Sequence, residues 1–258
     1  MRVYYMNGAG NDFMVIDARD QRPDFPQLAK ELCKLTGADG FMAIDRSEIA
    51  DFRLHFYNSD GTRGEMCGNG ARCICRFAHD LGLAGETMVV QTDAGLVSGQ
   101  RITQDTYRIH LNLPSVIDLH RLGDTAYVEL GNPGCPHCVT EVPGLTWDMR
   151  EQLRQTARNL RHNPAFPKGA NANLYTWLDD TTVRLLTYVR GVEDYTLACG
   201  TGSGSTAVTL WKQGKLPGGE LTVKNPGGNL KVTVRSEGEE ITALLLEGPT
   251  EITKILDV

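Results

Sequence analysis

The sequence has no long apolar run, no block of basic residues and no even number of cysteines. Each of these absences argues against one class of protein. No stretch approaches the roughly 20 apolar residues that cross a bilayer as a helix. The N-terminus breaks at Asn7-Gly8 without the apolar core of a signal peptide. The formal net charge is −6, so neither a nucleic acid nor an anionic membrane is an expected partner. We therefore predict a cytoplasmic protein.

The chain contains seven cysteines, an odd number that argues against a disulfide framework in a reducing compartment. Each thiol is then packing, a metal ligand or a reactive group. Free cysteine most often packs as a small apolar side chain. We adopt that interpretation for Cys33, Cys73 and Cys75, which lie within or beside apolar stripes.

Apolar periodicity predicts many strands and few helices. Alternating apolar residues predict strands within 52–56, 107–113 and 230–234, and stripes at helical spacing predict helices within 28–35, 74–81 and 149–160. Leu35 is expected to share the buried face of the first helix, and Asp148 with Glu151 resembles a capping box for the third. This mixture favours an α+β fold over a regular alternation of strand and helix.

An internal repeat divides the chain. Residues 67–70 (Cys-Gly-Asn-Gly) and 199–202 (Cys-Gly-Thr-Gly) each lead into a helical stretch, a glycine turn, a short strand and another glycine. The repeat predicts two pseudo-symmetric halves, each a mixed, mainly antiparallel sheet around a central helix. We place the first half at 1–116, with 248–258 returning to it, and the second at 117–247. The active site is expected in the cleft between the halves.

The repeated cysteines stand where a helix begins. A helix start offers unpaired N–H groups and partial positive charge, which favour a thiolate or a bound carboxylate. Two such sites suit the inversion of an amino-acid α-carbon, in which one thiolate removes a proton and a thiol returns one to the opposite face. Residues 200–205 lack the last glycine of a dinucleotide-binding motif, and the sequence has no P-loop.

At this point the sequence resembles the diaminopimelate epimerase family along its whole length. The segments that carry the resemblance are 7–13 (NGAGNDF), 56–61 (FYNSDG), 66–73 (MCGNGARC), 196–202 (TLACGTG) and 225–228 (NPGG). The resemblance implies two α/β halves, a homodimer, no pyridoxal phosphate or other cofactor, and no metal. It also implies interconversion of LL- and meso-2,6-diaminopimelate by two thiols, in the synthesis of lysine and peptidoglycan precursors.

Carried over position by position, the resemblance makes Cys67 and Cys199 the catalytic pair and His137 an assistant paired with Cys67. The positions that match the family's substrate-binding residues are Asn11, Asn58, Gly68, Asn69, Asn171, Arg190, Gly200 and Thr201. Arg190 would hold the distal carboxylate with its two-pronged guanidinium.

The sequence departs from the family at three places. Val189 stands where the family has Glu before Arg-Gly, and Tyr195 stands where it has a second Glu. The family's Gly-Asn-Pro-His becomes the longer segment 131–137. The two lost carboxylates keep open an alternative, a racemase of the same scaffold that acts on histidine, ornithine or lanthionine.

Two further alternatives concern other chemistry. The phenazine-type isomerases share the two-half architecture but lack the cysteine pair, and we reject them because both cysteines are present. Residues 135–138 (Cys-Pro-His-Cys) could form a redox dithiol, or a zinc site with Cys73 and Cys75. A zinc site is disfavoured because Cys-x-Cys on a helix points its thiols to different faces.

Overall fold

A computed structural model of the chain describes residues 1–64 and 67–257. The chain forms two compact units. Unit 1 contains residues 1–110 together with the C-terminal segment that starts at Glu247, and unit 2 contains residues 111–246. The sequence analysis drew the first boundary at 116/117, whereas the contacts divide at His110/Leu111, so the strand at Pro114–Leu122 belongs wholly to unit 2.

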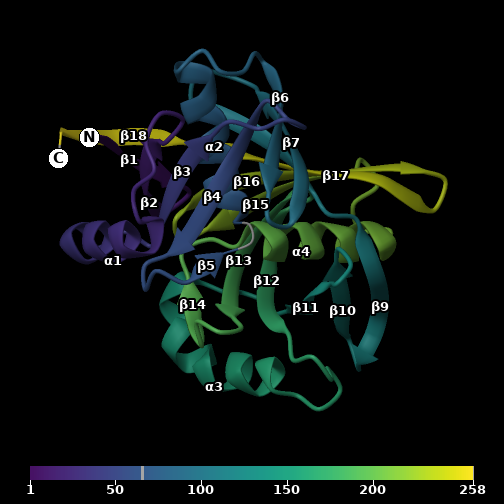
Figure 1. Ribbon diagram of the computed structural model, residues 1–258. Coiled ribbons are helices and arrows are strands. Elements are labelled where there is room, and N and C mark those ends of the chain that lie inside the picture. Colours follow the sequence, from purple (N-terminus) through teal and green to yellow (C-terminus); the bar gives the residue numbers. More distant parts are fainter. Residues whose placement is uncertain (65–66, 258) are drawn as a thin grey trace. The chain divides into compact units, whose positions relative to one another are not determined.

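Unit 1 is a mixed sheet with two helices (Figure 1). Its elements are β1 (Arg2–Gly8), β2 (Asn11–Asp17), α1 (Phe25–Thr36), β3 (Gly40–Asp45), β4 (Phe52–Asn58), β5 (Arg63–Gly64), α2 (Gly68–Asp80), β6 (Thr87–Thr92), β7 (Gly95–Arg101), β8 (Thr106–Leu111) and β18 (Glu251–Asp257). The strand order is β18-β1-β2-β3-β4-β6-β7-β8, and β5 also pairs with β4. Only β2–β3 and β4–β6 are parallel among these pairs, and α1 and α2 make those two crossovers.

Unit 2 repeats this plan. Its elements are β9 (Pro114–Leu122), β10 (Thr125–Leu130), β11 (Cys135–Glu141), α3 (Arg150–Arg161), β12 (Asn171–Asp179), β13 (Thr182–Val189), β14 (Asp194–Thr196), α4 (Gly200–Lys212), β15 (Glu220–Asn225) and β16 (Gly228–Glu237), followed by β17 (Glu240–Pro249), which runs past the unit boundary. The order is β9-β10-β11-β12-β13-β15-β16, with β11–β12 and β13–β15 parallel and crossed by α3 and α4. The predicted repeat and α+β class are confirmed.

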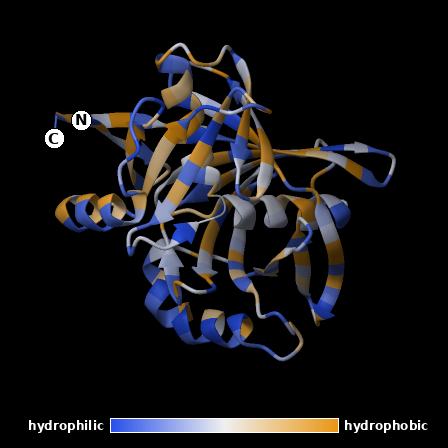
Figure 2. Cartoon of the chain, viewed as in Figure 1, coloured by the Kyte–Doolittle hydropathy of each residue, from blue (hydrophilic) through white to orange (hydrophobic). Residues whose placement is uncertain are grey.

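Each sheet is covered by a helix on either face. In unit 1, Met14 and Ile16 pack toward α1 with its residues Ala29 and Leu32, while Phe13 on the alternate face lies beside the start of α2. In unit 2 an equivalent apolar cluster lies beneath α3, which is largely hydrophilic on its outer side (Figure 2). The second crossover helix of each unit therefore sits on the face opposite the first.

Two local predictions are wrong. Leu35 is 77% exposed, because the buried face of α1 runs through Ala29, Leu32 and Cys33. Asp148 and Glu151 do not form a capping box: a short 3₁₀ turn occupies Trp147–Met149, α3 starts after it, and Glu151 pairs with Arg154 at 2.7 Å.

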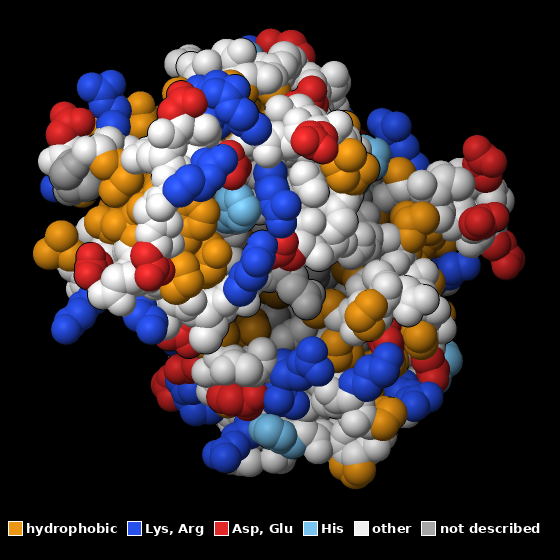
Figure 3. All heavy atoms as spheres, viewed as in Figure 1, with side chains coloured by type: hydrophobic (Ala, Val, Ile, Leu, Met, Phe, Trp, Pro, Cys, Tyr) orange, Lys and Arg blue, Asp and Glu red, His pale blue; other side chains and the backbone are white. Residues whose placement is uncertain are grey.

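The surface of the described residues carries both signs of charge. Acidic and basic side chains are interspersed on the face drawn in Figure 3. Within residues 1–64 and 67–257, no helix has the length and apolar character needed to cross a membrane.

Candidate active site at two helix starts

The first signature segment is a tight hairpin that approaches the start of α2. Between β1 and β2, Ala9 and Gly10 have φ of 52° and 89°, the backbone that a two-residue hairpin turn requires. A Cβ on Gly8 would lie 2.9 Å from the carbonyl oxygen of Asn69 and 2.8 Å from Sγ of Cys73. Glycine at position 8 therefore lets the hairpin reach the helix that follows Cys67.

Cys67 is the N-cap of α2. Its φ and ψ are −127° and 125°, the extended backbone typical of this position, and its side chain is half-buried. Asn69, in the first turn, donates from Nδ2 to Oδ1 of Asn11 at 2.6 Å, and Asn11 donates to Oδ2 of Asp39 at 3.1 Å. The structure thus joins Cys67, Asn69 and Asn11, three predicted site residues, at one place in unit 1.

Opposing effects act on the Cys67 thiol. Burial raises its pKa above the ordinary value, while the backbone N–H groups of Asn69 and Gly70 and the guanidinium of Arg72 act to lower it. The carboxylate of Asp39 adds a smaller upward effect on this pKa. The helix start therefore opposes the cost of charging a thiol that is largely out of water.

Cys199 is the N-cap of α4 in the same backbone conformation, with φ of −129° and ψ of 111°. Its Sγ accepts a hydrogen bond from the N–H of Gly202 at 3.3 Å and lies 3.5 Å from Oγ1 of Thr201. At Cys67 the corresponding N–H of Gly70 acts to lower the pKa of the thiol but makes no cap hydrogen bond of this kind. The two thiols share a position in the fold but differ in their immediate partners.

Beneath the start of α4 lies a cluster of buried polar side chains. His137 and Asn173 have no exposed surface, and Thr187 is 2% exposed. Asn173 Nδ2 lies 3.2 Å from Nδ1 of His137 and donates to the carbonyl of Cys138 at 2.9 Å, while Thr187 donates to Oδ1 of Asn173 at 3.0 Å. Every polar side chain in this cluster has a partner, as buried polar groups require.

His137 faces Cys135, with 3.4 Å between Nε2 and Sγ. Burial, with a smaller effect from the Arg190 guanidinium, lowers the pKa of His137 to about 3. The imidazole is therefore neutral near pH 7, where it can orient a partner through hydrogen bonds but does not supply an imidazolium. The pairing of His137 with Cys67 stays a prediction.

Asn171 and Arg190 are joined through the backbone. Asn171 Oδ1 accepts from the N–H of Arg190 at 2.8 Å, and its Nδ2 donates to the carbonyl of Pro136 at 3.0 Å. The Arg190 side chain is exposed, and its Nη1 donates to the carbonyl of Lys168 at 3.0 Å. Asn171 is thus a buried support of the β13 end, while Arg190 presents a charged group that a ligand can reach.

The two departures from the family pattern lie on either side of Arg190. Val189 is half-buried at the end of β13. Tyr195 is buried in β14 with its ring against Tyr188, and its hydroxyl has no hydrogen-bond partner among the described residues. Asn58, at the end of β4, is exposed and donates to Oγ1 of Thr62 at 3.0 Å.

Four of the other cysteines are protonated packing groups. Burial raises the pKa of Cys33 to about 11 and that of Cys73, Cys75 and Cys138 to about 12. Residues 135–138 lie in β11, where side chains alternate between faces: Cys135 lies beside His137, whereas Cys138 packs into the cluster under α3. The redox dithiol is wrong for this geometry, because thiols three residues apart on a strand point to opposite faces.

The sequence analysis missed Arg72 and Thr187 and gave Asn173 no role. Arg72 is the largest side chain of the described residues with no exposed surface. A signal was present, because Arg72 stands among small and apolar residues, between Ala71 and residues 73–75 (Cys-Ile-Cys).

The sequence is similar to known proteins over most of its length. The sequence model described as diaminopimelate epimerase matches residues 3–110 and 130–252. The chain is 33% identical to a diaminopimelate epimerase of Flavobacterium psychrophilum, with 97% of each chain covered. It is 39% identical to one of Campylobacter jejuni subsp. doylei, with 80% of each covered.

Solved structures share the fold at low identity. A PhzF-family phenazine biosynthesis protein of Bacillus anthracis matches with a TM-score of 0.75 and 15% identity, covering 100% of this chain and 98% of the other. A probable proline racemase of Agrobacterium radiobacter matches with a TM-score of 0.70 and 17% identity, covering 100% and 92%. These likenesses concern the fold alone.

Proposed function

Because the chain belongs to the diaminopimelate epimerase family, we propose that it is an isomerase that interconverts LL- and meso-2,6-diaminopimelate. In this proposal Cys67 and Cys199 are the two bases, and the substrate is a small amino acid with two α-carbon centres. The observation that carries the proposal is that each cysteine caps the second crossover helix of its unit.

The helix starts supply what the reaction needs most. An amino-acid α-proton is very weakly acidic, so the carbanion that forms must be stabilised by donors aimed at the carboxylate. Gly68 and Asn69 after Cys67, and Gly200 and Thr201 after Cys199, carry the first N–H groups of the two helices. These N–H groups have no partner within the helix, so they can bind the reacting carboxylate.

The proton transfers balance without any other reagent. One cysteine, as the thiolate, takes the α-proton and becomes a thiol, and the C–H electron pair remains on the α-carbon. The second cysteine, as the thiol, gives its proton to the opposite face of that carbon and becomes the thiolate. The reverse direction exchanges the two roles.

The remaining predicted residues select and hold the substrate. Arg190 is exposed and charged, which suits a distal carboxylate, and Asn171 fixes its backbone. Asn11 and Asn69 hold each other beside Cys67 and provide amide groups for the reacting end. The expected homodimer and cytoplasmic location stay predictions.

The proposal is tested by proton exchange. Protein incubated in D2O with LL- or meso-diaminopimelate should exchange the α-hydrogen, detected by NMR, while lysine, which lacks the distal carboxylate, should not exchange. Cys67→Ser and Cys199→Ser should each abolish epimerisation, by roughly the 10⁴-fold or more expected when a reacting base is lost. Cys33→Ser, which changes a buried thiol within α1, is the matched control and should retain activity.

Histidine, ornithine and lanthionine are assayed in parallel because Val189 and Tyr195 replace two carboxylates of the family pattern. Exchange on one of these and not on diaminopimelate would assign the alternative substrate. Full turnover by either cysteine variant would instead rule out the two-thiol mechanism.

A further inference from the structure

Arg72 is a cation enclosed in the interior of unit 1. It lies in α2, five residues after Cys67, and its side chain has no exposed surface. A buried guanidinium is costly unless its charge is matched, since water no longer solvates it. The positive charge of Arg72 therefore needs a group nearby that can match it.

The hydrogen-bond partners of Arg72 are neutral. Nη2 donates to Oδ1 of Asn69 at 2.9 Å, and Nη1 donates to the carbonyl of Gly68 at 3.3 Å. Nε is buried without a hydrogen-bond partner among the described residues. These contacts hold the side chain against the first turn of α2, but they do not neutralise its charge.

The ionisable groups that face Arg72 in the described part of unit 1 are the thiols of Cys67, Cys73 and Cys75. Cys73 and Cys75 are completely buried, and burial raises the pKa of each to about 12, so both are neutral. Cys67 is half-buried at the N-cap, where the helix start also favours a negative charge. Cys67 is the one thiol of this set placed to become the counter-ion.

The position of α4 that corresponds to Arg72 does not carry a cation. The residue five positions after Cys199 is Gly204, and a Cβ there would lie 2.7 Å from Leu111 and 3.3 Å from Leu244. The pocket that Arg72 fills in unit 1 is thus closed by leucines in unit 2. Cys199 instead accepts the N–H of Gly202 as its cap hydrogen bond.

We propose that Arg72 is a positioning residue whose charge stabilises the Cys67 thiolate when it forms and whose hydrogen bond holds Asn69 toward Asn11. The role of Cys67 as a base depends on the proposed function. The effect of Arg72 on the Cys67 thiol depends only on its burial and on its place against the first turn of α2.

Other charged side chains also affect the pKa of Cys67 and of its neighbour Cys73. Asp39, whose carboxylate holds Asn11, opposes the thiolate. Asp12 and Arg76 face the neighbouring Cys73 with opposite signs. Since Arg72 is the cation that faces Cys67 among the described residues, its removal should raise the pKa of that thiol.

The test follows the alkylation of Cys67 by iodoacetamide against pH, with each site quantified by mass spectrometry. Arg72→Gln should raise the midpoint for Cys67 by about 1 to 2 pH units, the usual effect of removing a close opposite charge. In this variant the rate of Cys67 alkylation at about pH 7.5 should fall at least tenfold, because a higher pKa leaves less thiolate to react. Cys199 in the same molecule is the internal reference and should keep its profile.

Two further variants separate charge from shape. Arg76→Gln removes an arginine one turn further along α2, which binds the carbonyl of Thr250, and should leave the Cys67 midpoint unchanged. Arg72→Lys keeps the charge but cannot make both of the arginine's hydrogen bonds, and should keep the midpoint within about half a unit.

An unchanged midpoint in folded Arg72→Gln, or an equal shift of Cys199, would overturn the proposal. If Arg72→Gln does not fold, Arg72→Lys decides: a rise of one unit or more with the charge still in place would show that charge is not the cause. Alkylation needs no substrate, so this result stands apart from the diaminopimelate assay.

Discussion

The starts of α2 and α4 have the same backbone, yet they rest on surfaces of different chemistry. The strand register shows which residues occupy equivalent positions beneath the two helices. Phe13 pairs with Gly40 in unit 1, and His137 pairs with Asn171 in unit 2, so Phe13 and His137 correspond. Two residues further along, Met42 pairs with Phe56 and Asn173 pairs with Thr187. The matched sets are Phe13, Met42 and Phe56 in unit 1 and His137, Asn173 and Thr187 in unit 2. One helix start rests on apolar side chains and the other on a hydrogen-bonded network.

This difference shows that one fold can support a thiol in two ways. In unit 1 the apolar surface under Gly70 is combined with a buried cation, Arg72, inside the helix. In unit 2 the corresponding position of α4 is Gly204, which lies against leucine side chains. The polar groups there, His137 and Asn173, belong to strands of the sheet. The symmetry of the backbone therefore does not extend to the side chains that support the two helix starts.

The largest expected effect comes from making unit 2 resemble unit 1 through His137→Phe. The folded state lowers the pKa of His137 from 6.5 to about 3, so the unfolded chain binds the proton more readily. The stability from this group is complete above pH 6.5 and is lost as the pH falls toward 3. Between pH 7 and 4 the loss amounts to about 3 kcal/mol.

Urea unfolding at both pH values measures this loss. Other groups titrate over the same range, so the quantity of interest is the difference between the wild type and His137→Phe, whose acid sensitivity should be smaller by that amount. Phe13→Leu in unit 1 is the matched control and should leave the pH dependence as in the wild type. Equal acid sensitivity in wild type and His137→Phe would show that His137 is not held neutral.

A smaller effect is expected from adding one methyl group beneath each helix. A Cβ on Gly202 would clash with Oδ1 of Asn173 and lie 3.0 Å from Oγ1 of Thr187, both fixed in the network. A Cβ on Gly70 would lie 3.1 Å from Sδ of Met42, a flexible side chain. Gly202→Ala should lower the free energy of unfolding by about 2 kcal/mol, and Gly70→Ala by less than about 1 kcal/mol.

Thermal and urea denaturation of the two alanine variants give this comparison directly, each variant serving as the control for the other. A helix-favouring effect of alanine is common to both and cancels. Equal losses would mean that the polar network adapts as easily as the apolar surface.

The sequence predicted the parts of the fold that depend on periodicity and repetition. Residues 67–70 and 199–202 mark two helix starts, and alternation in 52–56 and 230–234 marks β4 and β16. Local signals failed where tertiary packing decides: Leu35 fits its stripe but is exposed, and a 3₁₀ turn displaces the expected capping box.

The surfaces beneath the helices could not be read from the sequence. Asn173 and Thr187 lie on neighbouring strands and become partners only through the register of β12 and β13. His137 lies in the segment Cys-Pro-His-Cys (135–138), which gives no sign of its burial. Its low pKa follows mainly from complete burial, which the neighbouring sequence does not predict. The pattern of a single sequence indicates the type of secondary structure and the turns. Contacts between residues on different strands depend on the strand register, which that pattern does not fix.

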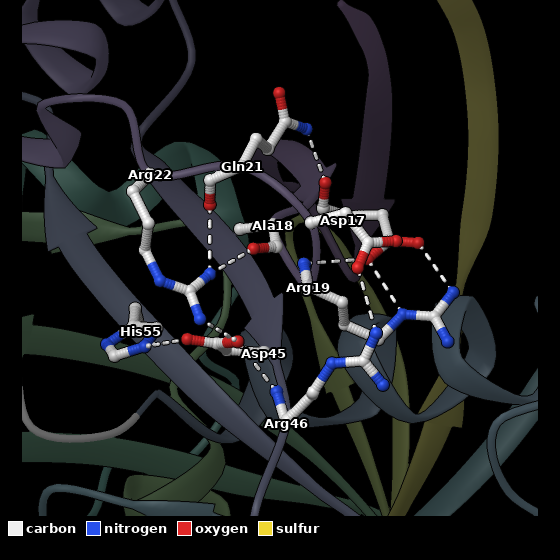
Figure 4. A network of polar contacts seen from close by, with 9 residues as sticks. Asp17, Ala18, Arg19, Gln21, Arg22, Asp45, Arg46 and His55 are labelled. Atoms are coloured by element: carbon white, nitrogen blue, oxygen red, sulfur yellow. Dashed lines mark hydrogen bonds and ion pairs between the residues drawn. The ribbon is translucent and has the colours of Figure 1, made fainter.

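The smallest effect should come from a polar network with one exposed partner, Arg22, although the side chains of Asp45 and His55 are only 13% and 15% exposed. In unit 1, Asp45 at the end of β3 lies 3.2 Å from Nη2 of Arg22 and 3.3 Å from Nε2 of His55 (Figure 4). The Arg22 side chain is 62% exposed, so water and salt screen the pair. Burial lowers the pKa of His55, which favours the neutral ring near pH 7 and leaves mainly a hydrogen bond to Asp45.

Asp45→Asn should therefore change the free energy of unfolding by less than about 1 kcal/mol, as exposed ion pairs usually do. Urea unfolding at low and high salt measures it, with Arg22→Ala as the control that removes only the exposed partner. The same experiment on Asn173→Ala should cost more, because that change leaves Thr187 and His137 buried without their shared partner. A loss at Asp45 as large as the loss at Asn173 would mean that burial does not separate the two networks, and the contrast between the helix starts would need another cause.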